Sequence, residues 1–264
     1  SRSSLIETRA YEPDRDLLTS IEMKYGSTVR AKHAYTYDSM ARRDTLVQQG
    51  SHFSSYGGSL FTDYSYNPRS EVTGMDVFQS SSATTNEALR VAGRGFAWDY
   101  DLAGNHLSIT HKAARAGQGA VPQNLTYTRT SNSLNQYSSL ANADYAELSG
   151  VVNSAWTVSV GSAPENITRA NRTGDYFHSF PLVRGGDNGV VHDTLTLYGV
   201  NNGAGAGGKD QLFTHQQDVT LRPKTEDFNY DSRGNLTLDG LWKYTWDAED
   251  RLISMEHTAA AITA

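Results

Sequence analysis

Aromatic residues recur at alternate positions along the chain, a pattern that indicates β-strands with one buried face. Tyr35 and Tyr37 flank one polar residue, and Tyr244 and Trp246 flank another. The best helical candidate spans only 87–92 and stops at a glycine. We therefore predict an all-β protein whose strands are joined by tight turns and bury their aromatic faces.

One short phrase recurs at these strands, in which aromatic residues precede an Asp and a Gly follows three positions later. The clearest copies span 228–237 and 96–107, with degenerate copies near 35, 64 and 244 and a weaker one near 11. The Asp suits the first position of a type I turn, and the Gly suits the left-handed residue that closes a hairpin with a bulge. The residues with these predicted roles are Asp38, Asp101, Gly104, Asp231, Gly234 and Asp247. Each copy is thus predicted to be one hairpin, and side-by-side hairpins form an antiparallel sheet.

The phrase is interrupted between 142 and 222, where short strand-like runs alternate with clusters of Gly, Asn and Pro. Runs at 156–160, 176–183, 192–200 and 218–221 have the length and spacing of strands in a small immunoglobulin-like (Ig-like) β-sandwich. We therefore expect a hairpin sheet at 1–141, a sandwich at 142–222, hairpins continuing the first sheet at 223–256, and a tail at 257–264.

Composition excludes several classes of protein. The 264 residues carry 23 basic and 29 acidic side chains, a net charge of −6, which does not fit a nucleic-acid binder. The absence of cysteine excludes disulfides, zinc fingers and iron–sulfur clusters. No apolar run reaches the length of a membrane-spanning helix, so we expect no membrane insertion.

Few residues carry a chemical signature. The eight histidines lie at 33, 52, 106, 111, 178, 192, 215 and 257, and no two have the spacing of a metal-ligand pair. We predict structural or surface roles for them, with no metal and no cofactor. The glycine-rich run 203–208 fits G-x-G-x-x-G, but it precedes a strand-like run and is predicted to be a loop.

Two sets of residues support alternative functions. Asp99 and Asp101 lie beside Trp98, and a polysaccharide-acting glycoside hydrolase needs such a carboxylate pair in an aromatic groove. Trp156 and Tyr176 are candidates for glycan binding, although the alternation of Trp156 with Val158 also suits a core position. The repeat explains both aspartates without chemistry, so we expect no active site and keep the hydrolase as the alternative.

The repeated phrase resembles the YD-repeat, or Rhs-repeat, family, whose name describes the same Tyr-Asp-x-x-Gly motif. The segments 134–140 and 240–252 also resemble stretches of bacterial members. In that family the repeats wind a long β-sheet into a hollow shell, as in bacterial toxin complexes and animal teneurins. The resemblance implies a structural or encapsulating role, a secreted or cell-surface bacterial location, and the remainder of a shell or a second copy as partner.

The interruption resembles the bacterial Ig-like modules found beside carbohydrate-active enzymes, including the second domain of glucodextranase. Its residues 151–166, 174–177 and 194–196 carry this resemblance, which implies a spacer or a polysaccharide-binding module. The chain has too few repeats to close a shell, and it lacks the Asp-Pro-x-Gly segment of the family's autoproteolytic end. We therefore expect a fragment or module that forms a partial β-shell with exposed edge strands and accessible apolar surface.

Overall fold

The computed structural model describes residues 4–112, 124–163, 166–183 and 189–258, and these are almost entirely β-strands and turns. The predicted all-β, antiparallel fold class is confirmed. Within the helical candidate 87–92, the structure has a short 3₁₀ turn, η2 (Glu87–Leu89). No helix in the described ranges is long and apolar enough to cross a membrane. Residues 164–165 and 184–188 of the predicted sandwich, and 259–264 of the predicted tail, lie outside the described residues.

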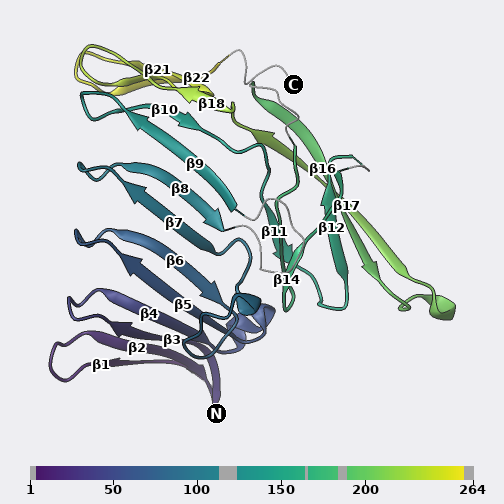
Figure 1. Cartoon of the computed structure of the whole chain (residues 1–264). Helices are drawn as coiled ribbons and strands as arrows, with labels where there is room; N and C mark the ends of the chain where they lie inside the picture. The colour runs from purple at the N-terminus through teal and green to yellow at the C-terminus, as the bar shows by residue number, and fades with distance from the viewer. Residues whose placement is uncertain (1–3, 113–123, 164–165, 184–188, 259–264) are drawn as a thin grey trace.

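The largest sheet has eleven antiparallel strands in the order β1-β2-β3-β4-β5-β6-β7-β8-β9-β10-β18. Figure 1 shows its hairpins stacked from the N-terminus upward, with their turns gathered along one side. Strand order follows chain order because each hairpin pairs with the next one. The first ten strands are β1 (Leu5–Tyr11), β2 (Leu18–Tyr25), β3 (Thr28–Tyr37), β4 (Arg43–Gln49), β5 (Ser59–Tyr66), β6 (Val72–Phe78), β7 (Gly95–Tyr100), β8 (His106–Lys112), β9 (Asn124–Ser131) and β10 (Tyr137–Ala141).

The chain leaves this sheet after β10 and returns at β18 (Thr225–Asp227), which pairs with β10. The residues between these two strands are therefore an insertion between neighbouring strands. After β18 the chain forms β19 (Asn229–Tyr230), β20 (Leu236–Leu238), β21 (Trp242–Trp246) and β22 (Leu252–His257). These four strands form their own antiparallel sheet, and the N–H of Phe228 between β18 and β19 bonds to the Ser138 carbonyl (3.0 Å).

The insertion consists of two small sheets. One has the order β11 (Leu148–Val151), β15 (Tyr176–Ser179), β14 (Asn171–Thr173). The other has the order β13 (Thr168–Arg169), β12 (Thr157–Gly161), β16 (Val191–Asn201), β17 (Gln211–Leu221). Phe177 from the first sheet shares a buried cluster with Val158, Val160 and Leu195 from the second, so the two sheets pack as a sandwich. The glycine-rich run 203–208 lies in the connection between β16 and β17, at the tip of a hairpin that projects from the body in Figure 1.

The insertion docks on one face of the eleven-stranded sheet, which we call the inner face. Tyr176 of β15 packs with Phe53 of η1 (Ser51–Tyr56) and with Leu60 and Val77 of the sheet. A second contact pairs Phe180 with Leu125. The inner-face aromatics of the repeat, including Tyr35, Tyr64 and Trp98, are half-buried rather than buried as expected.

Candidate functional site

In the described part of the chain, six hairpin turns share one geometry, and we call them the repeat turns. The first residue of each accepts the N–H of the residue three positions later and donates its own N–H to the carbonyl four positions later. Its side-chain Oδ1 accepts the N–H groups two and four positions later, so one oxygen closes the turn twice. The six first residues are Asp38, Asn67, Asp101, Asn132, Asp231 and Asp247.

The fourth residue of each repeat turn is left-handed. Gly104 and Gly234 take φ of 90° and 92°, which a residue with a Cβ adopts only with strain. The other four turns place non-glycine residues at φ of about 60°, in the narrower left-handed region that an L-residue can occupy. These are Ala41, Ser70, Asn135 and Asp250.

The turn geometry also lowers the pKa values of Asp101 and Asp231. The side-chain hydrogen bond from Asn105, followed by backbone N–H groups, holds the pKa of Asp101 below its usual value. Backbone hydrogen bonds, led by the N–H of Asn235, lower the pKa of Asp231 in the same way. Both oxygens of Asp101 accept hydrogen bonds within its own turn. A carboxylate held in this way is poorly suited to act as a general acid.

Each repeat turn also hydrogen-bonds to the next one, and we call this row of contacts the turn ladder. Arg69 donates to the carbonyls of Asp101 (2.6 Å) and Leu102 (2.9 Å) in the following turn. Gln136 donates to the Gly234 carbonyl (3.3 Å), so the ladder bridges the insertion. The ladder donors are Arg15, Arg42, Arg69, Asn105, Gln136 and Arg233.

The aromatic residue before the turn Asp has a structural partner as well. The hydroxyl of Tyr37 donates to the Leu18 carbonyl (2.7 Å), and that of Tyr100 donates to the Val72 carbonyl (2.8 Å). Each of these bonds crosses to a neighbouring strand of the hairpin stack. Corresponding bonds are made by Tyr66, Tyr230 and the indole N–H of Trp246.

The alternative hydrolase residues do not meet in a groove. Asp99 alternates with Trp98 along β7 and so lies on the outer face, where it accepts a hydrogen bond from Ser108 (2.8 Å). Asp101 lies in its repeat turn. The structure therefore separates both carboxylates from the aromatic inner face.

The two candidate glycan residues lie in different surroundings. Tyr176 is 7% exposed and its ring packs 4.9 Å from that of Tyr56, which leaves no open ring face for a sugar. Burial raises the pKa of Tyr176 to about 12. Trp156 is half-buried, with its ring edge-on to Phe213 at 5.2 Å.

The inner face carries a pocket of about 470 Å³. Its floor is formed by side chains at alternate positions of β4 to β9, including Tyr64, Phe96 and Tyr127. Arg94 contributes to the lining, and Glu147, from the segment that leads into β11, is the one carboxylate among the described lining residues. The pocket thus combines aromatic rings with one positive and one negative side chain.

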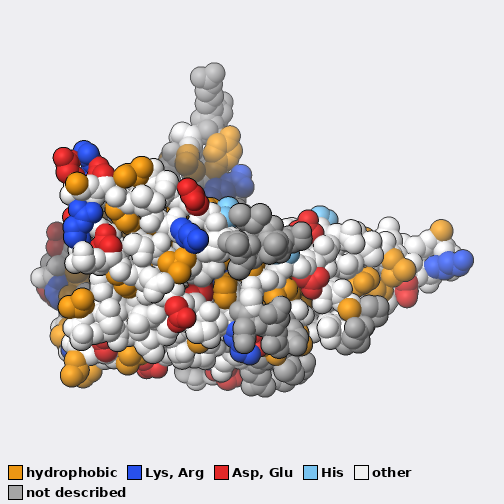
Figure 2. Space-filling view, turned by 90° about the horizontal axis from the view of Figure 1, so that it is seen from above, with side chains coloured by type: hydrophobic (Ala, Val, Ile, Leu, Met, Phe, Trp, Pro, Cys, Tyr) orange, Lys and Arg blue, Asp and Glu red, His pale blue; other side chains and the backbone are white. Residues whose placement is uncertain are grey.

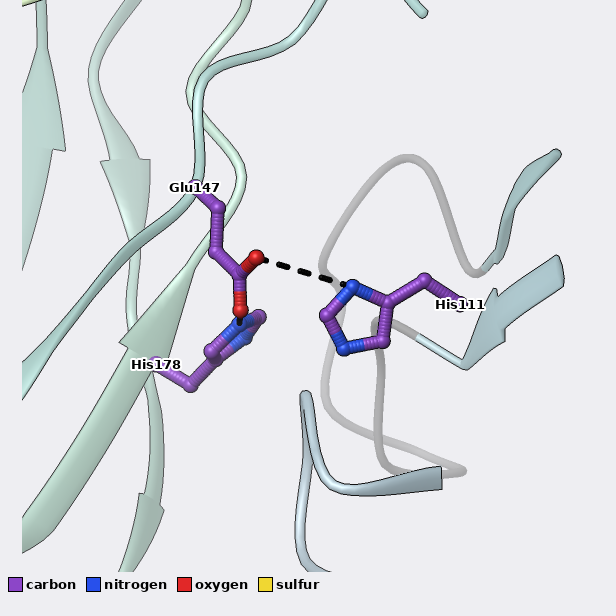
Figure 3. Close-up of side chains that lie close together, drawn as sticks. All are labelled: His111, Glu147 and His178. Atoms are coloured by element: carbon purple, nitrogen blue, oxygen red, sulfur yellow. Dashed lines mark hydrogen bonds and ion pairs between the residues drawn. The ribbon is translucent and has the colours of Figure 1, made fainter. Parts of the chain in front are cut away.

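At one end of this pocket, His111 of β8 and His178 of β15 lie on either side of Glu147 (Figure 3). Glu147 Oε1 is 3.0 Å from His178 Nε2, and Glu147 Oε2 is 3.6 Å from His111 Nδ1. Burial acts to raise the pKa of Glu147, but the hydrogen bond from His178 and the charges of both histidines outweigh it and leave that pKa lowered. Two imidazoles and one carboxylate are a donor set that a divalent transition metal can use.

Comparisons with known proteins give a distant match. No protein-family model and no curated protein matches the sequence. A crystal structure of TcdB2–TccC3–Cdc42 is 15% identical with a TM-score of 0.39, and the match covers 96% of this chain and 11% of that chain. A structure of the Photorhabdus luminescens Tc holotoxin pore is also 15% identical, with a TM-score of 0.38, and the match covers 96% of this chain and 11% of that chain. A crystal structure of TcdB2–TccC3 is 14% identical with a TM-score of 0.38, and the match covers 96% of this chain and 11% of that chain.

The chain therefore spans about a tenth of the length of the chains that it matches in these structures. At such identities and TM-scores the likeness by itself identifies neither a family nor a function.

The histidine cluster is the feature that spacing along the sequence does not reveal. His111 and His178 belong to separate elements, and they meet only because the insertion folds back onto the inner face. Local motifs detect ligands that share one helix, strand or loop. The sequence carries no signal that pairs these two residues with Glu147.

Proposed function

We propose that this chain is an architectural segment of a β-sheet wall, a partial shell of the YD/Rhs-repeat kind that its sequence resembles. The observation that carries the proposal is the turn ladder, in which each hairpin repeats the same turn and bonds to the next. Gln136 continues the ladder to Gly234 on the far side of the insertion. A structure that grows by repeating one unit in one direction is suited to building a wall.

The two ends of the hairpin stack support further growth. β1 forms one edge of the eleven-stranded sheet, where Leu5 and Ile6 are 65% and 54% exposed. β22 forms the edge at the other end, with Ile253 and Met255 exposed. Figure 2 looks down on that end and shows hydrophobic side chains between charged ones. Because an apolar edge strand invites strand pairing, the partners we propose are further hairpins of the same repeat, in a longer chain or a second copy.

We infer that the insertion is an Ig-like module. Its order β11-β15-β14 facing β13-β12-β16-β17 corresponds to strands B-E-D facing C′-C-F-G of the immunoglobulin fold. Its contacts through Tyr176 and Phe180 support a role as a spacer fixed to the wall. Polysaccharide binding at Trp156 stays a prediction. A secreted or surface-attached bacterial location is likewise proposed from the family resemblance.

Self-association tests the wall proposal. Leu5→Lys places a charge on the β1 edge, and Leu102→Lys makes the same change at a 98% exposed turn position away from any edge. We expect sedimentation velocity to show concentration-dependent association of the unaltered chain. Leu5→Lys should weaken that association and Leu102→Lys should not. A strict monomer at all concentrations, or equal effects of the two variants, contradicts the proposal.

The hydrolase alternative has less support, because glycoside hydrolysis uses two carboxyl groups and the described pocket lining offers only Glu147. A screen on chromogenic glycosides and esters separates the two functions. We expect no turnover above background. Activity that disappears in a folded Asp99→Asn, Asp101→Asn or Glu147→Gln variant would instead establish an enzyme.

A further inference from the structure

We propose that His111, Glu147 and His178 bind a zinc ion that joins the insertion to the eleven-stranded sheet. The three residues come from β8, from the segment before β11, and from β15. One potential ligand atom from each lies within 4.8 Å of the other two. A metal bound there ties the sheet to the sandwich at their junction.

The hydrogen bonding of His111 supports a cation beside it. His111 Nε2 lies 2.8 Å from the Gly93 carbonyl, which only accepts, so Nε2 carries the proton. In the neutral ring Nδ1 then carries a lone pair and no proton, and it faces the acceptor Oε2 of Glu147 at 3.6 Å. Two acceptors that face each other need a proton or a metal ion between them. A histidine that donates its other N–H to a backbone carbonyl is the usual arrangement of a metal ligand.

The ring of His178 is also available as a ligand. It is 1% exposed, and its Nδ1 has no hydrogen-bond partner in the described part of the chain. The hydrogen bond to Glu147 places the ring proton on Nε2, and a metal ion bound there would take the place of that proton, with the ring proton moving to Nδ1. Gly93 makes room for this ring, because a Cβ at that position would lie 2.2 Å from His178 Nε2.

The spacing of the ligand atoms fits a small tetrahedral ion. Zinc bonds of about 2.0–2.1 Å place neighbouring tetrahedral ligand atoms about 3.3 Å apart. Glu147 Oε1 lies 3.0 Å from His178 Nε2, close to that value, and the other carboxylate oxygen, Oε2, lies 3.6 Å from His111 Nδ1. All three candidate ligand atoms lie within 4.8 Å of one another, so binding would require the side chains to close this spacing by at most about 1.5 Å.

The surroundings match those of a protein metal site. Phe96 stacks on His111 at 4.3 Å, and Phe180 meets both imidazoles edge-on at 5.2 and 4.5 Å. These rings pack apolar surface against the two imidazoles. His111 and Glu147 also line the inner-face pocket. Three protein ligands therefore leave a fourth position that a water or a small anion can reach from that pocket.

Zinc binding by the full chain tests the proposal. Chain treated with a chelator and dialysed is titrated with Zn²⁺ near neutral pH by calorimetry, and the metal content is measured after a second dialysis. We expect one zinc per chain and a higher Tm with zinc, because binding to the folded state stabilises it. Glu147→Gln and His178→Gln should lose stoichiometric zinc. His192→Gln, which alters an exposed histidine on β16, should retain it.

Spectroscopy of the unaltered chain covers the case in which a variant fails to fold. Loading with Co²⁺ should give the intense visible absorption of a four-coordinate site, and Zn²⁺ should displace it. The weak absorption of hydrated Co²⁺, or the absence of stoichiometric zinc, would overturn the proposal. Retention of zinc by both folded cluster variants would also overturn it, because the ion would then lie elsewhere.

Discussion

Asn142 and Glu226 lie 84 positions apart in the sequence, yet the Asn142 side chain donates a 2.6 Å hydrogen bond to the Glu226 carboxylate. Asn142 begins the insertion, and Glu226 lies in β18, where the chain rejoins the sheet. Glu226 is 1% exposed and also accepts bonds from Arg222 and from the N–H of Gly240. One buried carboxylate thus holds together the two crossings between sheet and insertion.

Replacing Glu226 tests whether this carboxylate stabilises the junction between the sheet and the insertion. Glu226→Ala leaves the N–H of Gly240 without its acceptor and removes an ion-pair partner of Arg222. We therefore expect a loss of about 2–3 kcal/mol in the free energy of unfolding. The matched control is Glu249→Ala, since the side chains of Glu249 and its partner Arg251 are 70% and 71% exposed. That control should change stability by less than about 0.5 kcal/mol in urea unfolding. Equal effects of the two variants would contradict a stabilising role of Glu226 at this junction.

The lowered pKa values of the repeat-turn aspartates predict a loss of stability in acid. Their pKa values are lowered in the folded state, so the unfolded chain binds more protons as the pH falls. Their contribution is complete above the unfolded pKa of about 3.9 and is lost as pH falls through the lower folded values. We expect Tm to drop as the pH falls below about 4.

Asparagine supplies the control for this acid effect. Asn67 and Asn132 form the same turn without a titrating group. An Asp101→Asn, Asp231→Asn double variant should therefore lose less Tm over this pH range than the unaltered chain. Identical acid profiles would show that other groups govern the acid transition.

The same turn should be equally important in different hairpins. Asp101→Ala and Asp231→Ala remove the same two backbone hydrogen bonds, and we expect them to lower Tm by similar amounts. Gly234→Ala should cost about 1 kcal/mol, because its φ of 92° strains a residue with a Cβ. Loss of an activity or a ligand affinity in Asp231→Ala at unchanged Tm would make that residue functional and refute the structural role.

The turn ladder predicts that its arginines stabilise the chain through backbone carbonyls. Arg69→Met keeps the apolar stem but loses two bonds to the next turn, which we expect to cost about 1 kcal/mol. The control is Arg9→Met, because Arg9 donates a hydrogen bond to the side chain of Glu7 on its own strand. Arg9→Met should leave Tm nearly unchanged in a thermal melt.

The strands and hairpins could be predicted because their determinants are local. Alternating aromatics and the Asp-to-Gly spacing act within a few residues, and the turns at Asp101 and Asp231 form where that spacing occurs. The turn at Asn132 breaks the phrase, because Asn replaces Asp and Ser131 replaces the aromatic residue. Its closing bonds are nevertheless the same.

The remaining features depend on contacts between distant segments. Ladder donors occupy different turn positions, such as the third for Arg69 and the fifth for Gln136, so no fixed spacing marks them. The cluster around Glu147 depends on how the insertion docks on the inner face. The partial exposure of the aromatic face depends on the same docking, which no local pattern specifies.

Amide hydrogen exchange of β1 tests the wall proposal most directly. In an antiparallel edge strand, alternate N–H groups bond to the neighbouring strand while the others point outward. The proposal predicts that the outward amides of Leu5–Tyr11 exchange rapidly at low concentration and become protected, at alternate positions, as the chain associates. Rapid exchange of these amides in a sample that is fully associated would contradict growth of the wall at β1.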